Sequence, residues 1–407
     1  MTADGTFVIV GAGLAGAKAA QTLREEGFYG RIVLIGAEPD RPYERPPLSK
    51  GVLTGDAVPD SVFVHDPGWY AEHDVDLRTG IRATGLDRAA RRLRLSDGTD
   101  LTYDKLLLAT GASPRPLDVP GARLDGVQQL RTRADSARIA TALTGSPHVV
   151  IVGAGWIGLE VAAAARQRGA TVTVVETAAL PLQRVLGDDM AHVFADLHRG
   201  HGVTFRFGTG VAEIRGTGKV STVVLTDGAE LPADLVVAAV GVRPDTELAE
   251  AAGLTVDNGV VVDESLRTAD PHIHAAGDVA NAYHPLLGRH LRVEHWSNAL
   301  HGGPVAARAM LGQQVSHDDL PYFFTDQYDL GMEYTGYAPP GGFDRVVIRG
   351  DLDRREFIAF WISDGRVLAG MNVNVWDVVP AIQALIRSGK PVDPHRLADP
   401  GVPWDEI

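Results

Sequence analysis

Cysteine is absent from this chain of 407 residues, and that absence excludes more chemistry than any other feature of the composition. Without thiolates the chain cannot form disulfides, ligate an iron-sulfur cluster, build a Cys-rich zinc site or pass electrons through a Cys pair. Any redox chemistry on this chain must therefore use a bound organic cofactor.

Long apolar runs and excess positive charge are also lacking. No run approaches the ~18 apolar residues of a transmembrane helix, and residues 1–16 contain no basic and apolar leader, so we expect a cytoplasmic protein without a membrane partner. The 38 Lys and Arg residues are outnumbered by 52 Asp and Glu residues, which gives a net charge of -14. Nucleic acid is therefore not expected as a partner. At roughly 150 residues per domain, the length predicts two to three domains.

What the chain does contain is an internal repeat. Two apolar, β-branched runs, Thr6–Val10 and His148–Val152, lead directly into GAGLAG at 11–16 and GAGWIG at 153–158. Each motif is followed by an Ala-rich helical stretch, a second predicted strand at 31–35 or 171–175, and an acidic residue, Glu38 or Glu176. This order predicts two βαβ units.

A second repeated segment follows each βαβ unit. The segment LSDGTDLTYD at 95–104 matches LTDGAELPAD at 225–234, and a Gly and then a Pro follow at equal spacing: Gly111 and Pro114, Gly241 and Pro244. An Asp-Gly pair predicts a hairpin turn, and the apolar residues after it predict a buried strand. The chain therefore contains two copies of one nucleotide-binding plan.

The glycine spacing has a physical reason in each copy. The first Gly permits a tight turn, the second lets a pyrophosphate approach the backbone, and the third lets helix and strand pack closely. The acid roughly 20 residues further on accepts hydrogen bonds from a ribose diol. Alternatively, the glycines only shape a turn. Glu176 would repel a 2'-phosphate and no Arg follows at 177–179, so the second site predicts NADH rather than NADPH.

Four further segments carry a family resemblance: YERPPLSK at 43–50, AAGD at 275–278, EHWSN at 294–298 and PYFFTDQY at 321–328. They resemble the putidaredoxin reductase family of FAD-dependent ferredoxin reductases. The resemblance implies an α/β fold with two Rossmann-like dinucleotide-binding domains and a C-terminal α+β interface domain. The FAD domain (1–112 and 245–318) would be split by an inserted NAD domain (113–244), and residues 319–407 would form the C-terminal domain.

The resemblance also implies an FAD site in the first repeat. Lys50 would lie beside the flavin, and Arg45 and Arg131 would support the phosphate and adenosine side. Asp278 would accept from the ribityl chain, or act as the N-cap of a following helix; Lys50 could instead be a solvated side chain. The implied FAD-binding residues are Gly11, Gly13, Leu14, Ala15, Gly16, Ala37, Glu38, Arg45, Pro46, Lys50, Ala83, Ala109, Thr110, Gly111, Arg131, Gly277, Asp278, Glu294, His295 and Trp296.

In the second repeat the resemblance implies an NAD site. Glu160 would orient the nicotinamide, although a Glu in the first turn of a helix is also favoured by the helix dipole. Lys50 and Glu160 are the predicted catalytic residues. The implied NAD-binding residues are Gly153, Gly155, Trp156, Ile157, Gly158, Glu160, Glu176, Arg184 and Gly241.

The activity implied by the resemblance is hydride transfer from NADH to FAD, then single-electron transfer to a 2Fe-2S ferredoxin that serves a monooxygenase or dioxygenase. Alternatives are reduction of a quinone or small organic acceptor, a membrane-associated NADH dehydrogenase, and NADH sensing of the apoptosis-inducing-factor type. We expect a monomer or homodimer, and no metal site among the 14 histidines. A local basic rim is expected to dock the ferredoxin, with Arg289, Arg292 and Arg308 as candidates.

Overall fold

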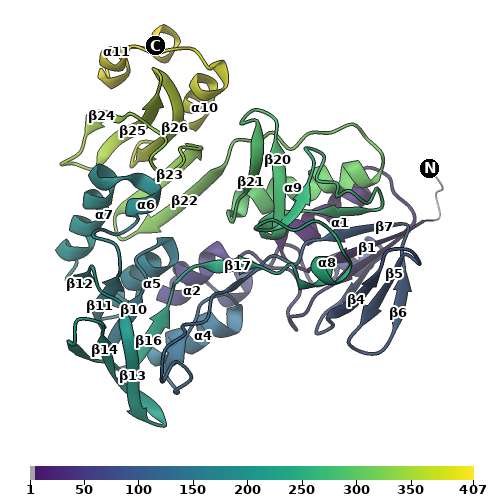
Figure 1. Cartoon of the computed structure of the whole chain (residues 1–407), viewed down its shortest axis with the longest axis horizontal. Coiled ribbons are helices and arrows are strands. Elements are labelled where there is room, and N and C mark those ends of the chain that lie inside the picture. The colour runs from purple at the N-terminus through teal and green to yellow at the C-terminus, as the bar shows by residue number, and fades with distance from the viewer. Residues whose placement is uncertain (1–4) are drawn as a thin grey trace. The chain divides into compact units, whose positions relative to one another are not determined.

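The computed structural model describes residues 5–407. The expectation that residues 1–16 contain no leader therefore lies partly outside the described residues, at residues 1–4. The chain divides into two compact units (Figure 1). Unit 1 contains residues 5–44, 60–113 and 242–321, and unit 2 contains residues 45–59, 114–241 and 322–407.

Unit 1 is built on a five-stranded parallel sheet in the order β19-β7-β1-β2-β3. Its strands are β1 (Thr6–Val10), β2 (Arg31–Ile35), β3 (Val75–Arg78), β7 (Lys105–Leu108) and β19 (Ile273–Ala275). The two strands predicted at 6–10 and 31–35 pair in register, with Val8 opposite Val33. Their apolar residues are buried because helices cover the sheet, as expected for parallel strands.

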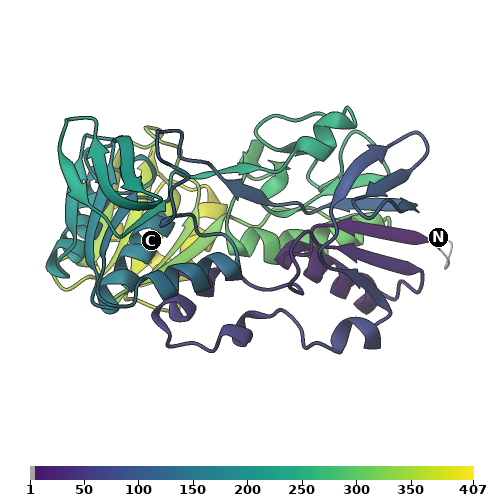
Figure 2. The same ribbon diagram turned by 90° about the horizontal axis from the view of Figure 1, so that it is seen from below.

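Helices α1 (Leu14–Glu25) and α9 (Trp296–Met310) lie side by side in unit 1 (Figures 1 and 2). Their approach is very close: a Cβ atom added to Gly303 of α9 would fall 2.3 Å from the carbonyl oxygen of Ala15. Small residues therefore bring the middle of α9 against the first turn of α1. The shorter helices of unit 1 are α3 (Trp69–Glu72) and α8 (Glu247–Ala251).

The smaller sheets of unit 1 include the hairpin predicted at 95–104. Strands β4 (Ala83–Asp87), β5 (Arg92–Leu95) and β6 (Asp100–Thr102) form one antiparallel sheet, and Gly98 has the positive φ of +85° that its turn requires. Strands β18 (Val260–Val262), β20 (Ala280–His284) and β21 (Arg289–Arg292) form a mixed sheet, in which β20 is parallel to β18 and antiparallel to β21. The short β8 (Ala112–Pro114) pairs with β17 (Val242–Pro244).

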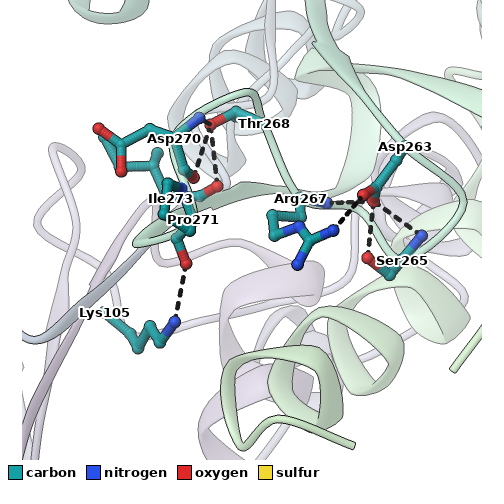
Figure 3. A network of polar contacts seen from close by, with 8 residues as sticks. All are labelled: Lys105, Asp263, Ser265, Arg267, Thr268, Asp270, Pro271 and Ile273. Carbon is teal, nitrogen blue, oxygen red and sulfur yellow. Dashed lines mark hydrogen bonds and ion pairs between the residues drawn. The ribbon is translucent and has the colours of Figure 1, made fainter. Parts of the chain in front are cut away.

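A network of polar contacts fixes the turn before β19 (Figure 3). One oxygen of Asp263 accepts the backbone N–H groups of Ser265 and Arg267 and the Ser265 hydroxyl, and the other accepts from the Arg267 guanidinium at 3.2 Å. Lys105 donates to the carbonyl of Pro271 at 2.7 Å, which attaches the turn to β7. The network thereby fixes the start of the strand that leads to Gly277 and Asp278.

Unit 2 repeats the parallel sheet in the order β12-β11-β10-β16-β9. Its strands are β9 (Val127–Gln128), β10 (His148–Val152), β11 (Thr171–Glu176), β12 (Thr204–Phe207) and β16 (Leu235–Ala238). Its helices are α4 (Arg133–Ala142), α5 (Trp156–Gln167), α6 (Gln183–Leu186) and α7 (Asp188–Gly200). The second predicted hairpin is formed by β14 (Lys219–Leu225) and β15 (Glu230–Pro232), with β13 (Val211–Thr217) beside β14.

A five-stranded antiparallel sheet, β22-β23-β26-β25-β24, completes unit 2. Its elements are β22 (Tyr322–Gln327), β23 (Leu330–Gly336), β24 (Arg345–Asp351), β25 (Glu356–Ser363), β26 (Arg366–Val373) and α10 (Val379–Ser388). The sequence from Pro391 to Pro403 predicts a loop or tail. That prediction is wrong for Pro394–Ala398, which form helix α11, and Asp393 caps this helix by accepting the N–H of His395.

The parallel and antiparallel sheets of unit 2 share one hydrophobic core. Trp361 of β25 is fully buried and donates its indole N–H to the carbonyl of Leu186 at 3.2 Å. Residues 45–59, which include α2 (Gly51–Thr54), also pack here: Ser136 donates to the Leu48 carbonyl at 2.8 Å and Arg168 to the Leu53 carbonyl at 3.0 Å.

Candidate functional site

The two glycine-rich loops use their three glycines in two different ways. Cβ atoms added to Gly11 or Gly153 would fall 2.0 Å from the Ala109 carbonyl oxygen or 2.4 Å from that of Ala239, so the first glycines are required by the packing of the chain itself. Cβ atoms added to the third glycines, Gly16 and Gly158, would fall 2.0 and 2.1 Å from carbonyl oxygens of their own loops.

The middle glycines are different. Cβ atoms added to Gly13 and Gly155 would meet no described atom within 4 Å, and both residues have φ values that any amino acid adopts. Internal packing therefore does not require glycine at these two positions. An unobstructed backbone at the N-terminus of a helix is what a pyrophosphate needs, because its oxygens accept N–H groups there. Both loops fit a dinucleotide.

In unit 1 the predicted residues gather at one edge of the parallel sheet. They follow the carboxyl ends of four strands: Gly11–Gly16 after β1, Ala37 and Glu38 after β2, Ala109–Gly111 after β7, and Gly277 and Asp278 after β19. A Cβ added to Gly277 would lie 3.2 Å from that of Ala15. The segment leading to Ala83 joins them, since Gly80 and Ile81 donate to the carbonyls of Glu38 and Gly36 at 2.8 and 2.9 Å. Glu294, His295 and Trp296 lie at the start of α9.

The alternative interpretation of Asp278 as a helix N-cap is wrong. Asp278 lies inside the 3-10 turn η3 (Gly277–Val279), and strand β20 rather than a helix follows it. Two docking candidates also fail. The Arg292 side chain is only 9% exposed and pairs with Glu294 at 2.7 Å, and Arg308 pairs with Glu26 at 2.7 Å. Neither supplies the uncompensated positive charge that a basic rim needs.

In unit 2 the loop itself holds Glu176, the last residue of β11. One carboxylate oxygen accepts the backbone N–H of Ala154 at 2.8 Å, and the other accepts the N–H of Ala178 at 2.9 Å. Ala154 lies between the first two glycines of the loop, so this carboxylate is fixed beside the dinucleotide-binding backbone. Its position matches the ribose-binding acid predicted from the spacing.

The other predicted NAD residues surround the same loop. Leu182 donates its N–H to the Ala154 carbonyl at 3.1 Å, which attaches the segment carrying the exposed Arg184. Gly241 follows β16 with φ +90°. Trp156 packs against Phe194 and Phe323, so its side chain belongs to the core, whereas Ile157 is 45% exposed.

The predicted catalytic residues Lys50 and Glu160 lie together in unit 2. Lys50 Nζ is 2.7 Å from Glu160 Oε1, and the side chains are only 16% and 4% exposed. The alternative of a solvated Lys50 is therefore wrong. So is the helix-dipole alternative for Glu160, which lies beyond the first turn of α5 and uses its carboxylate in tertiary hydrogen bonds.

Two residues that we did not predict complete this pair. Ser49 donates its hydroxyl to Glu160 Oε2, and Thr325 of β22 donates to Glu160 Oε1 at 2.7 Å. Both belong to segments that carry the family resemblance, 43–50 and 321–328. Their place in these two segments was the only sign in the sequence that Ser49 and Thr325 could be functional. Only the fold brings the two segments to one carboxylate. Nearby, the Arg45 guanidinium, next to Pro46, donates to the Arg131 carbonyl.

Several buried histidines are neutral, for an electrostatic reason. Burial lowers the pKa of His198 to about 4, of His274 to about 3 and of His295 to about 4. Over residues 5–407 no group of three or more His, Asp or Glu side chains is arranged to hold a metal ion. Within the same range no helix is long and apolar enough to cross a membrane.

Comparison with known proteins agrees with this geometry. Residues 5–303 match the family described as pyridine nucleotide-disulphide oxidoreductase, and residues 322–407 match the domain described as reductase C-terminal. The chain belongs to this oxidoreductase family. The absence of cysteine excludes the disulphide chemistry in the family's name and leaves its pyridine-nucleotide chemistry.

Two similar relatives identify the group within this family. The chain is 43% identical to the ferredoxin–NAD(+) reductase component of the anthranilate 1,2-dioxygenase system from Burkholderia cepacia, over 99% of this chain and 98% of the relative. It is 39% identical to putidaredoxin reductase from Pseudomonas putida, over 100% and 97%. The chain is therefore an oxidoreductase of the ferredoxin reductase group, for which FAD and NADH are the characteristic cofactors.

Solved structures show the same fold. The crystal structure of the covalent putidaredoxin reductase–putidaredoxin complex matches with a TM-score of 0.95 and 39% identity, over 99% of this chain and 97% of that chain. A ferredoxin reductase for the CYP199A2 system from Rhodopseudomonas palustris also has a TM-score of 0.95 and 39% identity, with 99% of each chain covered. The predicted fold class is confirmed.

Proposed function

We propose that this chain is an FAD-containing, NADH-dependent ferredoxin reductase whose ferredoxin serves a monooxygenase or dioxygenase. The observation that carries the proposal is the buried ion pair between Lys50 and Glu160, because Glu160 lies on α5, the helix that begins at the second dinucleotide loop. The names of the relatives support the ferredoxin as acceptor. The 2Fe-2S type of that ferredoxin, the oligomeric state and the cytoplasmic location stay predictions.

The assignment of residues to the two nucleotides is part of the proposal. Residues at the sheet edge of unit 1, from Gly11 to Gly16 and around Asp278, would hold the FAD pyrophosphate and ribityl chain. The assignment of Arg45, Lys50 and Arg131 to FAD stays a prediction. The loop 153–158, Glu176, Arg184 and Gly241 would hold NADH. The domain division at about residues 112, 244 and 318 is proposed with it. The repeated parallel sheets support the two boundaries near residues 112 and 244.

The chemistry of the bound cofactors is hydride transfer from NADH to FAD and one-electron release to the ferredoxin. The chain supplies binding and orientation. The backbone at Gly13 and Gly155 would receive the pyrophosphates, and Glu176 would hold a ribose. Glu160 would present a fixed carboxylate to the nicotinamide amide, and the Lys50 ammonium, paired with it at 2.7 Å, would supply positive charge that favours a reduced, negatively charged flavin.

The deciding experiment is NADH-driven cytochrome c reduction by the purified holoenzyme, with and without added 2Fe-2S ferredoxins. A large, saturable increase on adding a ferredoxin is expected. If NADH bleaches the flavin rapidly but none of several ferredoxins raises the rate, the acceptor is a quinone or a small organic molecule and the ferredoxin assignment is wrong.

A further inference from the structure

A line of buried polar side chains runs from Glu160 through the C-terminal sheet to α7. Thr325 and Gln327 alternate with outward-facing residues on β22, so both side chains point into the core, where each is only 1% exposed. Gln327 Nε2 is 3.1 Å from Thr325 Oγ1, and Gln327 Oε1 is 2.8 Å from His198 Nε2. The Tyr328 hydroxyl lies 3.4 Å from His198 Nδ1.

The direction of every bond in this line follows from its first member. A carboxylate accepts only, so the Thr325 hydroxyl must donate to Glu160 and is left to accept from the Gln327 amide nitrogen. The amide oxygen then faces His198 and accepts from its Nε2–H. Burial keeps this imidazole neutral, with a pKa of about 4, so Nδ1 accepts from the Tyr328 hydroxyl. All four donors therefore point toward Glu160.

Such a one-way chain has an electrostatic consequence. Hydrogen bonds that are aligned in series polarise one another, so each donor strengthens the next and the last one stabilises negative charge on Glu160. The Thr325 hydroxyl also shares Oε1 with Lys50 at 2.7 Å from each, while Ser49 occupies one position on Oε2. A carboxylate offers about four acceptor positions, so one more donor can be received on Oε2.

The outer end of the chain is also held in place. The Tyr328 ring stacks on His201 with centroids 3.7 Å apart and an interplanar angle of 5°, and Tyr328 has a φ of +57° in the turn between β22 and β23. His198 is fully buried on α7, and the chain therefore connects three elements of unit 2: α5, β22 and α7.

We propose that Thr325, Gln327 and His198 are positioning residues that fix the Glu160 carboxylate so that its open Oε2 position receives the nicotinamide amide. This inference rests on the proposed function, because it deepens the role given there to Glu160. It assigns the C-terminal sheet a part in the NAD site: β22 sets the orientation of a residue on α5 that no local interaction of that helix fixes.

The test compares NAD+ with ADP-ribose, which lacks the nicotinamide, by equilibrium titration of the oxidised holoenzyme. Thr325→Val keeps the shape of the side chain and removes the hydroxyl, so we expect the dissociation constant of NAD+ to rise about tenfold, with ADP-ribose affinity unchanged. Thr325→Ser restores the donor and should return NAD+ affinity to about the wild-type value. A loss of affinity for both ligands equally, or no loss for either, would overturn the proposal.

Two further variants make the result decisive even if Thr325→Val folds poorly. Gln327→Glu keeps the shape but presents an acceptor to the Thr325 hydroxyl, so it should weaken NAD+ selectively as well. Thr335→Val is the matched control, because Thr335 on the neighbouring strand β23 is equally buried and bonded to Gln383, away from the chain. Equal effects of Gln327→Glu and Thr335→Val on NAD+ affinity would reject a specific role for the chain.

Glu160→Gln separates this inference from the proposed function. If Glu160→Gln selectively weakens NAD+ and the Thr325 and Gln327 variants do not, Glu160 acts as proposed and the positioning chain is rejected. If Glu160→Gln itself leaves NAD+ affinity unchanged, the proposed role of Glu160 fails and the inference fails with it.

Discussion

Glu176 is the side chain that we expect to select between the two nicotinamide nucleotides. Its carboxylate is held by the N–H groups of Ala154 and Ala178, so it cannot swing away from the dinucleotide loop. A second negative charge at about 4 Å, such as a 2'-phosphate, costs on the order of 4 kcal/mol at an effective dielectric of 20, before screening by salt. The fixed position makes this repulsion hard to relieve.

We therefore expect the enzyme to prefer NADH over NADPH by more than about tenfold in kcat/KM, and Glu176→Gln to reduce that preference by about tenfold, mainly through a lower KM for NADPH. Steady-state kinetics with both nucleotides check this. Glu213→Gln, on the remote strand β13, should leave the ratio unchanged. Equal efficiency with both nucleotides in the wild type would contradict the prediction.

The expected role of a residue could be predicted from the sequence where the residue belongs to a local motif. It could not be predicted where the role depends on a contact between residues far apart in the chain. The roles of Gly13 and Glu176 follow from spacing that repeats in both halves. The hydrogen bond from Thr325 to Glu160 joins residues 165 positions apart. No spacing rule reaches that far, because only the packing of β22 on α5 creates it.

The two glycine-rich loops are the elements in which local sequence decides most. The third glycines are needed inside the protein, since a Cβ at Gly158 would lie 2.1 Å from the Gly153 carbonyl oxygen. The packing of the protein does not require the middle glycine of either loop, so we expect its small size to serve the bound nucleotide. We therefore expect each motif, which has the same glycine spacing, to combine a folding requirement with a binding requirement that substitution can separate.

Gly155→Ala should leave the thermal midpoint within about 1 °C of the wild type and raise the KM for NADH at least tenfold, because the new methyl occupies space that the pyrophosphate needs. Gly158→Ala should instead lower the thermal midpoint by several degrees, because it forces helix and strand apart. Differential scanning fluorimetry and NADH kinetics check both. A stable Gly155→Ala enzyme with normal KM would argue against the NAD assignment of this loop.

Secondary structure was predicted best where the signal is local. The strands at 6–10, 31–35, 148–152 and 171–175 and both Asp-Gly hairpins were predicted correctly, because β-branched runs and turn residues act through near neighbours. Helix α11 was missed, because it has only five residues and is stabilised by tertiary contacts. Arg349 on β24 donates to the carbonyls of Leu397 and Val402 on either side of its end.

The antiparallel C-terminal sheet depends on the core that it shares with the parallel sheet of unit 2. Trp361 contributes the largest fully buried side chain to that core, and its indole N–H bonds to the Leu186 carbonyl. We expect Trp361→Ala to lower the free energy of unfolding by about 3 to 5 kcal/mol, and Trp361→Phe by much less. Urea unfolding followed by circular dichroism measures this; a loss below about 1 kcal/mol for Trp361→Ala would contradict the shared core.

Over the whole molecule, acid should destabilise the fold through its buried histidines. The folded-state pKa is about 4 for His198 and His295 and about 3 for His274, below the unfolded value near 6.5. Between these values the unfolded chain binds protons that the folded chain excludes. The stability that each group contributes is therefore fully present above pH 6.5 and is lost as the pH falls toward 4.

We expect the thermal midpoint to fall by several degrees from pH 7.5 to 5.5, with each histidine contributing at most about 1.4 kcal/mol at pH 5.5. His274→Leu removes one of these groups from β19 and should make the decrease shallower. His148→Gln, at an exposed position, is the control and should leave it unchanged. An identical decrease in His274→Leu would show that other groups control acid stability.

The sequence by itself determined the redox class, the two glycine-rich loops and the strands on either side of them, since zero cysteines, glycine spacing and apolar runs can be read directly from the chain. Only the tertiary structure decided what surrounds Glu160: Lys50 and Ser49 arrive from one segment and Thr325 from another. The physical reason is how far apart in the chain the interacting residues lie. Turns and strands form through contacts between near neighbours, whereas a buried carboxylate takes whichever donors the folded core brings within hydrogen-bond distance.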